Sequence, residues 1–125
     1  MAGTAAFTDL DAHGSFTWIA HTDQWMQRAS AALVVDGGVY VVDPVDTPDL
    51  DARLAERGPV LGVLRLLNRH GRGGAAVAAR HGVDLVVAYE VTEPVHPDLM
   101  VIPVAAFPGW REVAVWMPGR RVLVV

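Results

Sequence analysis

Two apolar runs on either side of a tight-turn sequence constrain the fold of this chain more than any other feature. Residues 31–36 and 39–43 are rich in β-branched and other apolar side chains, and Asp36-Gly37-Gly38 between them is a strong hairpin signal. Both runs are apolar at nearly every position rather than at every second one, which is typical of strands buried on both faces. The sequence therefore predicts a hairpin that is covered on both sides.

The remaining residues alternate between strand-like and helical patterns. Thr47 and Pro48 supply an N-cap and a first helical residue, which predicts an amphipathic helix over 48–57. An alanine-rich helix is expected at about 74–81, ending before Gly82. Strands are expected at 16–21, 60–67, 85–89, 100–105, 112–117 and 121–125. This order indicates an α/β fold in the layered α+β sense, a mixed β-sheet with helices on one face.

The composition narrows the class of protein. The chain has 125 residues, enough for a single domain over residues 1–125, and it contains no cysteine. We expect residues 1–15 to be a loosely ordered lead-in. The first ten residues lack the basic and apolar regions of a secretory signal, and no apolar run is long enough to span a membrane. We therefore expect a cytoplasmic protein without a membrane partner.

Charge and hydrophobicity indicate the kind of partner. The net charge of −4 argues against nucleic acid, because binding to nucleic acid normally requires a basic face. Hydrophobic residues make up 52% of the chain, which is high for a small domain with much surface per volume. We expect the excess apolar surface to form one uncovered sheet face that packs against a second copy, as a homodimer, or against a partner protein.

A polar, glycine-rich loop is the place where a ligand site is expected. Residues 68–74 join the strand at 60–67 to the helix at 74–81, and ligands of open α/β sheets bind at such strand ends. Arginine side chains and the free N–H groups of a helix N-terminus both favour anions. The candidate residues for a small anionic ligand are Asn68, Arg69, His70, Arg72, Gly73 and, further along the chain, Trp110. The alternative is that these polar side chains only keep the loop solvated.

Other polar residues are weaker candidates. His70 is the one candidate for acid–base catalysis, and His21 and Asp23 could join it as ligands of a relocated metal ion. Asp43 and Asp46 follow the hairpin and are expected to form turns, with a catalytic carboxylate as the minority alternative. Trp116 lies inside a predicted strand and is expected in the core.

Several stretches of the chain resemble the metallo-β-lactamase superfamily. They include ALVVDGGVYVVDPVD within 31–46 and LRLLNRHGRGGAAVAARHGV over 64–83, together with 50–60 and 101–125. Members of that superfamily carry the motif HxHxDHxGG in this loop, and its imidazole and carboxylate groups hold zinc. Of the loop ligands only His70 matches. Asn68 replaces the first His of the motif, Arg72 the Asp and Gly73 the last His. An alignment on Gly73-Gly74 instead places His70 at the Asp and Gly71 at the last His, and neither alignment restores the site. Trp110 replaces the histidine of the family's later Gly-His motif.

The resemblance implies roughly the N-terminal half of the family's fold, with the zinc site lost and no cofactor. It favours a non-catalytic, metal-free domain that binds a small molecule or anion, or another protein. One alternative is a hydrolase of the superfamily with a rearranged active site built from His70, Arg72, His21 and Asp23. The other alternative is that the chain is the N-terminal fragment of a longer hydrolase-like protein.

Overall fold

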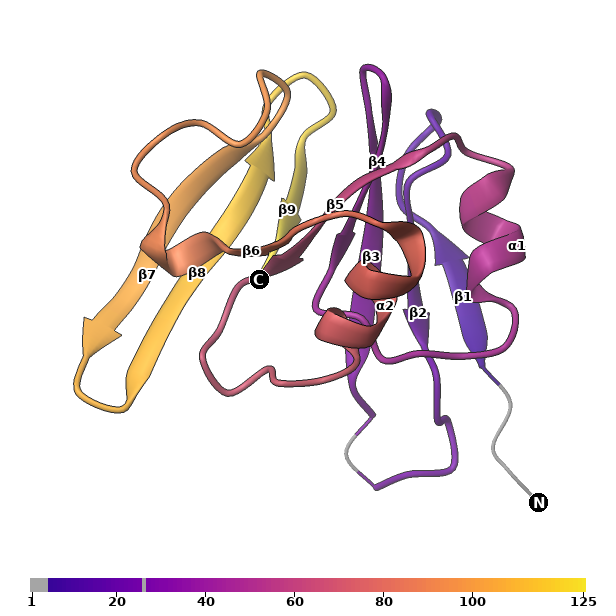
Figure 1. Ribbon diagram of the computed structural model, residues 1–125, viewed down its shortest axis with the longest axis horizontal. Coiled ribbons are helices and arrows are strands. Elements are labelled where there is room, and N and C mark those ends of the chain that lie inside the picture. The colour runs from indigo at the N-terminus through magenta and orange to yellow at the C-terminus, as the bar shows by residue number, and fades with distance from the viewer. Residues whose placement is uncertain (1–4, 26) are drawn as a thin grey trace.

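Two β-sheets and two short α-helices form three layers in residues 5–25 and 27–125, the part of the chain that the computed structural model describes (Figure 1). The helices cover one face of a six-stranded sheet, and a three-stranded sheet covers the other. Strands account for 42% of the described residues and helices for 14%. The fold is therefore a mixed sheet with few helices, mainly β, and the expected α/β class fits it only loosely.

The six-stranded sheet has its strands in chain order. They are β1 (Ala6–Asp9), β2 (Phe16–Ile19), β3 (Ala29–Val35), β4 (Gly38–Val42), β5 (Val60–Arg65) and β6 (Leu85–Val87). Strands β1 to β4 pair antiparallel, whereas β5 and β6 join in parallel orientation. The predicted hairpin is confirmed: β3 and β4 pair from Val35 and Gly38 outward, and every residue of β4 is buried.

The expectation of a loosely ordered lead-in over residues 1–15 is wrong for residues 5–15, the part of it that the structure describes. Residues 6–9 form β1, which pairs with β2 along its whole length. The ring of Phe7 lies 5.8 Å from that of Phe16 and 6.2 Å from that of Trp18, and the guanidinium of Arg53 lies 3.8 Å above it. A four-residue edge strand is too short to show a period of two in the sequence. Its strand structure depends instead on the contact of Phe7 with the aromatic rings of β2.

The two helices lie on one face, as expected. Helix α1 (Leu50–Ala55) is shorter than the predicted 48–57 because Asp49, not Thr47, precedes its first turn, yet it buries Leu50 and Leu54 as the pattern predicts. Helix α2 (Gly74–His81) has the predicted bounds, and Gly82 ends it in the left-handed conformation at φ 65°. The apolar side chains of both helices join a core cluster with Trp18, Val41 and Val63 of the sheet.

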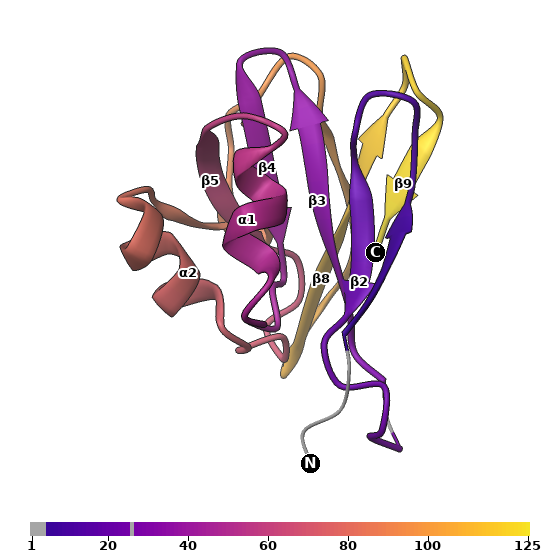
Figure 2. The ribbon, with the colours of Figure 1, turned by 90° about the vertical axis from the view of Figure 1, so that its right-hand side faces the viewer.

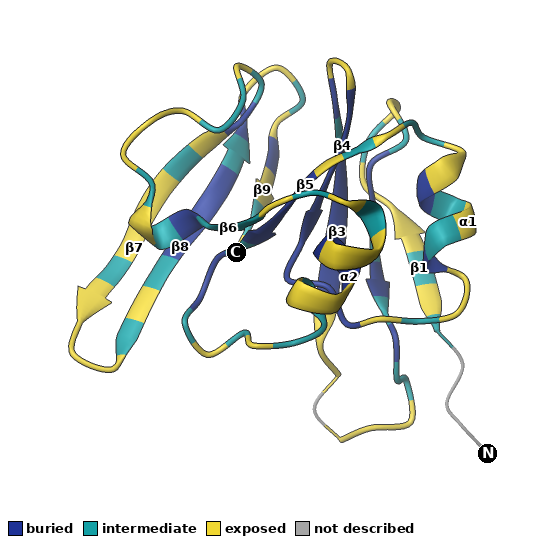
Figure 3. Cartoon of the chain, viewed as in Figure 1, coloured by how far each residue is buried: buried dark blue, intermediate teal, exposed yellow. Residues whose placement is uncertain are grey.

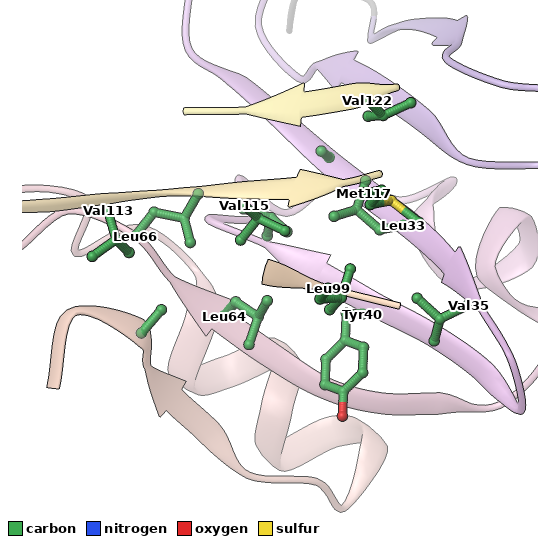
Figure 4. Packing of buried hydrophobic residues seen from close by; sticks show 13 residues of the cluster. Leu33, Val35, Tyr40, Leu64, Leu66, Leu99, Val113, Val115, Met117 and Val122 are labelled. Carbon is green, nitrogen blue, oxygen red and sulfur yellow. The ribbon is translucent and has the colours of Figure 1, made fainter. Parts of the chain in front are cut away.

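The last three strands form a separate antiparallel sheet. They are β7 (Met100–Phe107), β8 (Trp110–Met117) and β9 (Val122–Val124), and they follow a short 3-10 helix, η1 (Ala88–Glu90). An isolated antiparallel bridge between Leu67 and Glu112 links the chain after β5 to β8. In Figure 2, α1 lies in front of the six-stranded sheet and β8 behind it. Apolar side chains from both sheets meet between them (Figure 4), including Leu33, Leu64, Val115 and Met117.

The apolar sheet face that this chain leaves uncovered lies on the smaller, three-stranded sheet. Both faces of the central strands β3 and β4 are buried by this chain, whereas β7 is exposed along most of its length (Figure 3). Met100 and Leu123, the partners of Trp116 in the two neighbouring strands, are 52% and 57% exposed. Trp116 is half-buried beside them and takes no part in the core clusters of the described residues, so its expected place in the core is wrong. No described helix is long and apolar enough to cross a membrane.

Candidate functional site

The candidate site lies where β4 and β5 end, beside the loop that leads to α2. Asp43 follows β4 directly and is 4% exposed, with its backbone in the left-handed region at φ 43°. Its Oδ1 accepts the backbone N–H of Leu66 at 3.0 Å, and its Oδ2 lies 2.7 Å from Nδ1 of His70. Both carboxylate oxygens are therefore occupied, and they hold the loop after β5 against the end of β4.

His70 lines a small pocket beside the end of β4. The contact with Asp43 places the proton of a neutral ring on Nδ1, since a carboxylate accepts and does not donate. Nε2 has no hydrogen-bond partner among the described residues. The pocket has a volume of 230 Å³, and its polar lining includes Arg65, His70 and Arg72. Nε2 is thus the ring nitrogen that stays available to a ligand, because Asp43 holds Nδ1.

Arg72 crosses from the loop to the first residue of β3. Its Nη1 donates to the carbonyls of Ala29 at 2.6 Å and Asp43 at 3.1 Å. Its Nε is buried and has no hydrogen-bond partner within the described residues. Burial lowers the pKa of Arg72; the charge of Asp43 opposes that shift, and the charge of Arg28 adds to it. Arginine nevertheless keeps its proton, so the guanidinium is a fixed cation at the pocket.

Two other groups contribute positive potential. Arg65 lines the pocket while its Nη2 donates to the carbonyl of Asn68 at 2.5 Å, which shapes the loop. Helix α2 begins at the pocket with Gly74 and Ala75. The first N–H groups of a helix have no partner within it, and its first intrahelical bond here runs from Val77 to the carbonyl of Gly73. The pocket therefore combines arginine, histidine and a helix N-terminus.

The structure divides the predicted site residues into two groups. His70 and Arg72 both line the pocket, whereas Gly73 is not among its lining residues and donates its N–H to the carbonyl of Pro44 at 2.8 Å. Asn68 and Arg69 turn away instead, and both donate to the carbonyl of Gly109, at 3.3 and 3.2 Å.

Trp110 belongs to this second group. The guanidinium of Arg69 lies 4.8 Å from the centre of its ring. Oδ1 of Asn68 also accepts the backbone N–H of Arg111 at 3.0 Å. Asn68, Arg69 and Trp110 thus fasten the loop to the β7–β8 turn, and they do not line the pocket.

The donor set at the loop does not fit the zinc site that the resemblance implies. Nδ1 of His70 is held by Asp43, the amide of Asn68 is hydrogen-bonded to the β7–β8 turn, and Arg72 carries a positive charge. Within residues 5–25 and 27–125, no three histidine, aspartate or glutamate side chains are grouped so that they could hold a metal ion. His21 and Asp23 lie in the β2–β3 loop and form no such group with His70.

The sequence patterns indicate Asp43 mainly as a turn former, and they give no signal for Ser30. The hydroxyl of Ser30, which is 3% exposed, donates to the carbonyl of Asp43 and accepts the N–H of Val45, both at 2.9 Å. Asp46, the other predicted turn residue, instead forms an exposed pair with Arg80 at 2.8 Å. The signal for Asp43 was its position at the end of a fully buried strand, beside the end of the strand that leads into the loop.

Comparison with known proteins adds no identity to this geometry. The chain matches no protein-family model and no curated protein.

Proposed function

We propose that the pocket beside His70 binds a small anion, a carboxylate or a phosphate, and that the protein is a metal-free, non-catalytic binding domain of the cytoplasm. The observation that carries the proposal is the convergence of Arg65, Arg72 and the start of α2 on one pocket. Guanidinium groups and the free N–H groups of a helix N-terminus both favour anions. We also propose that the chain is related to the metallo-β-lactamase superfamily and shares its layered α/β fold.

The charge balance of the pocket supports an anion over a cation. Arg65, His70 and Arg72 line it together with the start of α2, whereas Asp43 is the one acidic residue in the lining. Both oxygens of Asp43 already accept hydrogen bonds from the loop, so its charge is directed away from a ligand. The volume of 230 Å³ limits the ligand, or the part of it that enters, to a few heavy atoms.

The test is a titration with inorganic phosphate and with acetate, followed by NMR chemical shifts of the backbone amides. Amides of residues 70–75 are expected to shift, and Arg72→Ala is expected to weaken binding by about tenfold or more, as for loss of a charged hydrogen-bond donor. Arg69→Ala is the matched control, because Arg69 belongs to the same loop but contacts Trp110 and Gly109. Absence of binding, or equal loss in both variants, would overturn the proposal.

Metal content gives a separate test of the metal-free part. Protein expressed and dialysed with zinc is expected to contain far less than one zinc ion per chain by elemental analysis. A content near one zinc would contradict the proposal and direct attention to His21, Asp23 and His70 as ligands.

The second candidate is a hydrolase, and one observation favours it. The buried carboxylate of Asp43 orients His70 through a 2.7 Å contact and leaves Nε2 without a partner among the described residues, which is the arrangement of an oriented general base. Arg72 would then stabilise negative charge on the reacting group. A panel of activated esters separates the two candidates. Turnover that disappears in His70→Gln but persists in Arg69→Ala would favour the hydrolase.

A further inference from the structure

The inner face of β7 loses its cover where the larger sheet ends. Pro103 pairs with Val113 and Ala106 with Arg111, so both lie on the face of β7 that continues the core between the sheets. Val113 is buried, yet Pro103 and Ala106 are exposed. The reason is that β6, the last strand of the larger sheet, has only three residues and is followed by η1. The larger sheet thus stops short of this part of β7.

A cavity of 720 Å³ occupies the space between these layers. Its lining comes from η1, the segment 91–97 and strands β7 and β8, and it shares no lining residue with the His70 pocket. The volume lies in the range of about 300–1,000 Å³ that small-molecule sites occupy. The proposed function above does not use this cavity.

The cavity is apolar at its base. Ala88, Leu99 and Val113 line it and are 1%, 4% and 6% exposed, so they form a floor that belongs to the core between the sheets. Apolar surface in such a concave place is removed from water when a ligand enters. A hydrocarbon group is therefore favoured on this floor.

The wall of the cavity is held in place by the β3–β4 hairpin. Oη of Tyr40 donates to the carbonyl of Val95 at 3.4 Å, and Oδ2 of Asp98 accepts the backbone N–H of Asp36 at 2.9 Å. Nδ1 of His96 accepts the backbone N–H of Asp98, so the proton of the neutral ring is on Nε2, which donates to the carbonyl of Asp36 at 2.9 Å. The cavity is thus preformed, and a ligand has little chain to order when it binds.

The one arginine of the lining is already engaged. Nη2 of Arg111 donates to the carbonyl of Tyr89 at 2.8 Å, and Nη1 lies 3.5 Å from the carboxylate of Glu90. The charge of Arg111 is therefore compensated by the η1 segment.

The acidic residues of the lining place no carboxylate on the floor. Glu112 alternates with Arg111 and Val113 along β8, so its side chain points to the opposite face of the sheet. Glu93 is exposed at the rim, where solvent screens its charge. Neither a cation nor an anion would therefore find an opposite charge beside the floor, and a charge buried there without a partner would be costly.

We infer that this cavity binds a neutral small molecule with a hydrocarbon body. Apolar contact with Ala88, Leu99 and Val113 selects the ligand, and an uncharged polar group such as a hydroxyl can stay at the rim in contact with water. The site is independent of the anion pocket and stands whether or not that pocket binds its ligand.

The experiment compares neutral probes of increasing length with charged probes of one length. Binding of butanol, hexanol and octanol to the full chain is followed by NMR shifts of the amides of residues 88–113. The affinity is expected to rise about threefold to fourfold with each added methylene group. Hexylammonium and hexanoate are each expected to bind about fivefold or more weakly than hexanol, because a charged head draws the chain away from the floor.

Three variants keep the test specific. Ala106→Phe places a large side chain on the exposed inner face of β7 and is expected to weaken binding of hexanol by about tenfold or more, while the amide spectrum stays that of a folded chain. Ala79→Phe, the matched control, makes the same change at an exposed position of α2 outside the lining and is expected to leave binding unchanged. Glu93→Gln is also expected to leave the affinity for hexanol unchanged.

Three outcomes would overturn the inference. They are equal affinity for the three alcohols, tighter binding of either ion than of hexanol, and unchanged binding of hexanol in Ala106→Phe. The last outcome would place the alcohols on another apolar surface of the chain. Phosphate binding in the same samples reports the His70 pocket separately.

Discussion

Oδ2 of Asp43 lies 2.7 Å from Nδ1 of His70 and joins the end of β4 to the loop that follows β5. The same carboxylate accepts the N–H of Leu66, and its backbone carbonyl accepts from Ser30 and Arg72. Asp43 is therefore the residue around which the candidate site is assembled, and its structural and functional roles can be separated by substitution.

Substitution of Asp43 is expected to destabilise the protein. Asp43→Ala leaves the Leu66 N–H and Nδ1 of His70 without their acceptor and removes the negative charge near Arg72, and should lower the free energy of unfolding by about 3 kcal/mol. Asp43→Asn should cost less, about 1–2 kcal/mol, because asparagine retains an acceptor and tolerates the positive φ of 43°. Urea denaturation of both variants measures this. A loss below about 0.5 kcal/mol in the alanine variant would contradict the role assigned to this carboxylate.

Gly38 is expected to be intolerant of any side chain. A Cβ at this position would lie 2.3 Å from the backbone carbonyl oxygen of Pro59 and 2.8 Å from Cγ of Leu61, and backbone cannot move away cheaply. Gly38→Ala should therefore lower the free energy of unfolding by about 2–3 kcal/mol, as for an overpacked core. Gly119→Ala is the control, because nothing lies within 4 Å of its Cβ and its φ is not positive. Equal stability of the two variants by thermal denaturation would show that β4 and the chain before β5 can separate.

Asp11 is expected to contribute stability that depends on pH. Burial alone would raise the pKa of Asp11, but hydrogen bonds from Ser15 and His13 and the charge of Arg120 more than offset it, so the pKa is lowered from 3.8. A carboxyl whose pKa is lower in the folded state stabilises the protein above its unfolded pKa. That contribution is lost as the pH falls from about 4 through the still lower folded value.

The comparison of wild type with Asp11→Asn measures this contribution. The difference in free energy of unfolding should be largest near pH 6 and should shrink between about pH 4 and pH 2. Urea denaturation at these pH values gives the difference directly. A difference that is constant over this range would mean that the charge of Asp11 contributes no stability.

Self-association through the smaller sheet stays a prediction from the apolar content of the sequence. The exposed apolar side chains Met100, Ile102 and Leu123 lie on β7 and β9, and an apolar patch without charge is complementary to itself across a two-fold axis. Ile102→Glu and Leu123→Glu should each shift a dimer to monomer, because the same charge would meet its own copy. Sedimentation equilibrium measures the shift. A wild-type chain that is monomeric at all concentrations tested would contradict the homodimer.

Local patterns in the sequence were enough to predict the elements that do not depend on distant partners. The β3–β4 hairpin followed from Asp36-Gly37-Gly38 between two apolar runs, and Gly37 has the positive φ of 94° that such a turn needs. The bounds of α2 followed from its alanine content and from Gly82, which ends it in the left-handed conformation. Both signals act within a few residues, where the turn and helix propensities of the chain dominate.

Tertiary structure decided the site and the second sheet. Asp43 and His70 are separated by 27 positions, and only the parallel pairing of β4 with β5 brings them together. Asn68 and Arg69 share a loop with His70, yet the β7–β8 turn, about 40 residues away, draws them out of the pocket. Likewise, β7, β8 and β9 were predicted as strands, but their separation into a second sheet depends on packing across Leu64 and Val115. The sequence by itself determined which residues form turns, helices and strands, because those preferences are local. The contacts that make a pocket join segments far apart in the chain, and only the burial of apolar surface between the layers selects them.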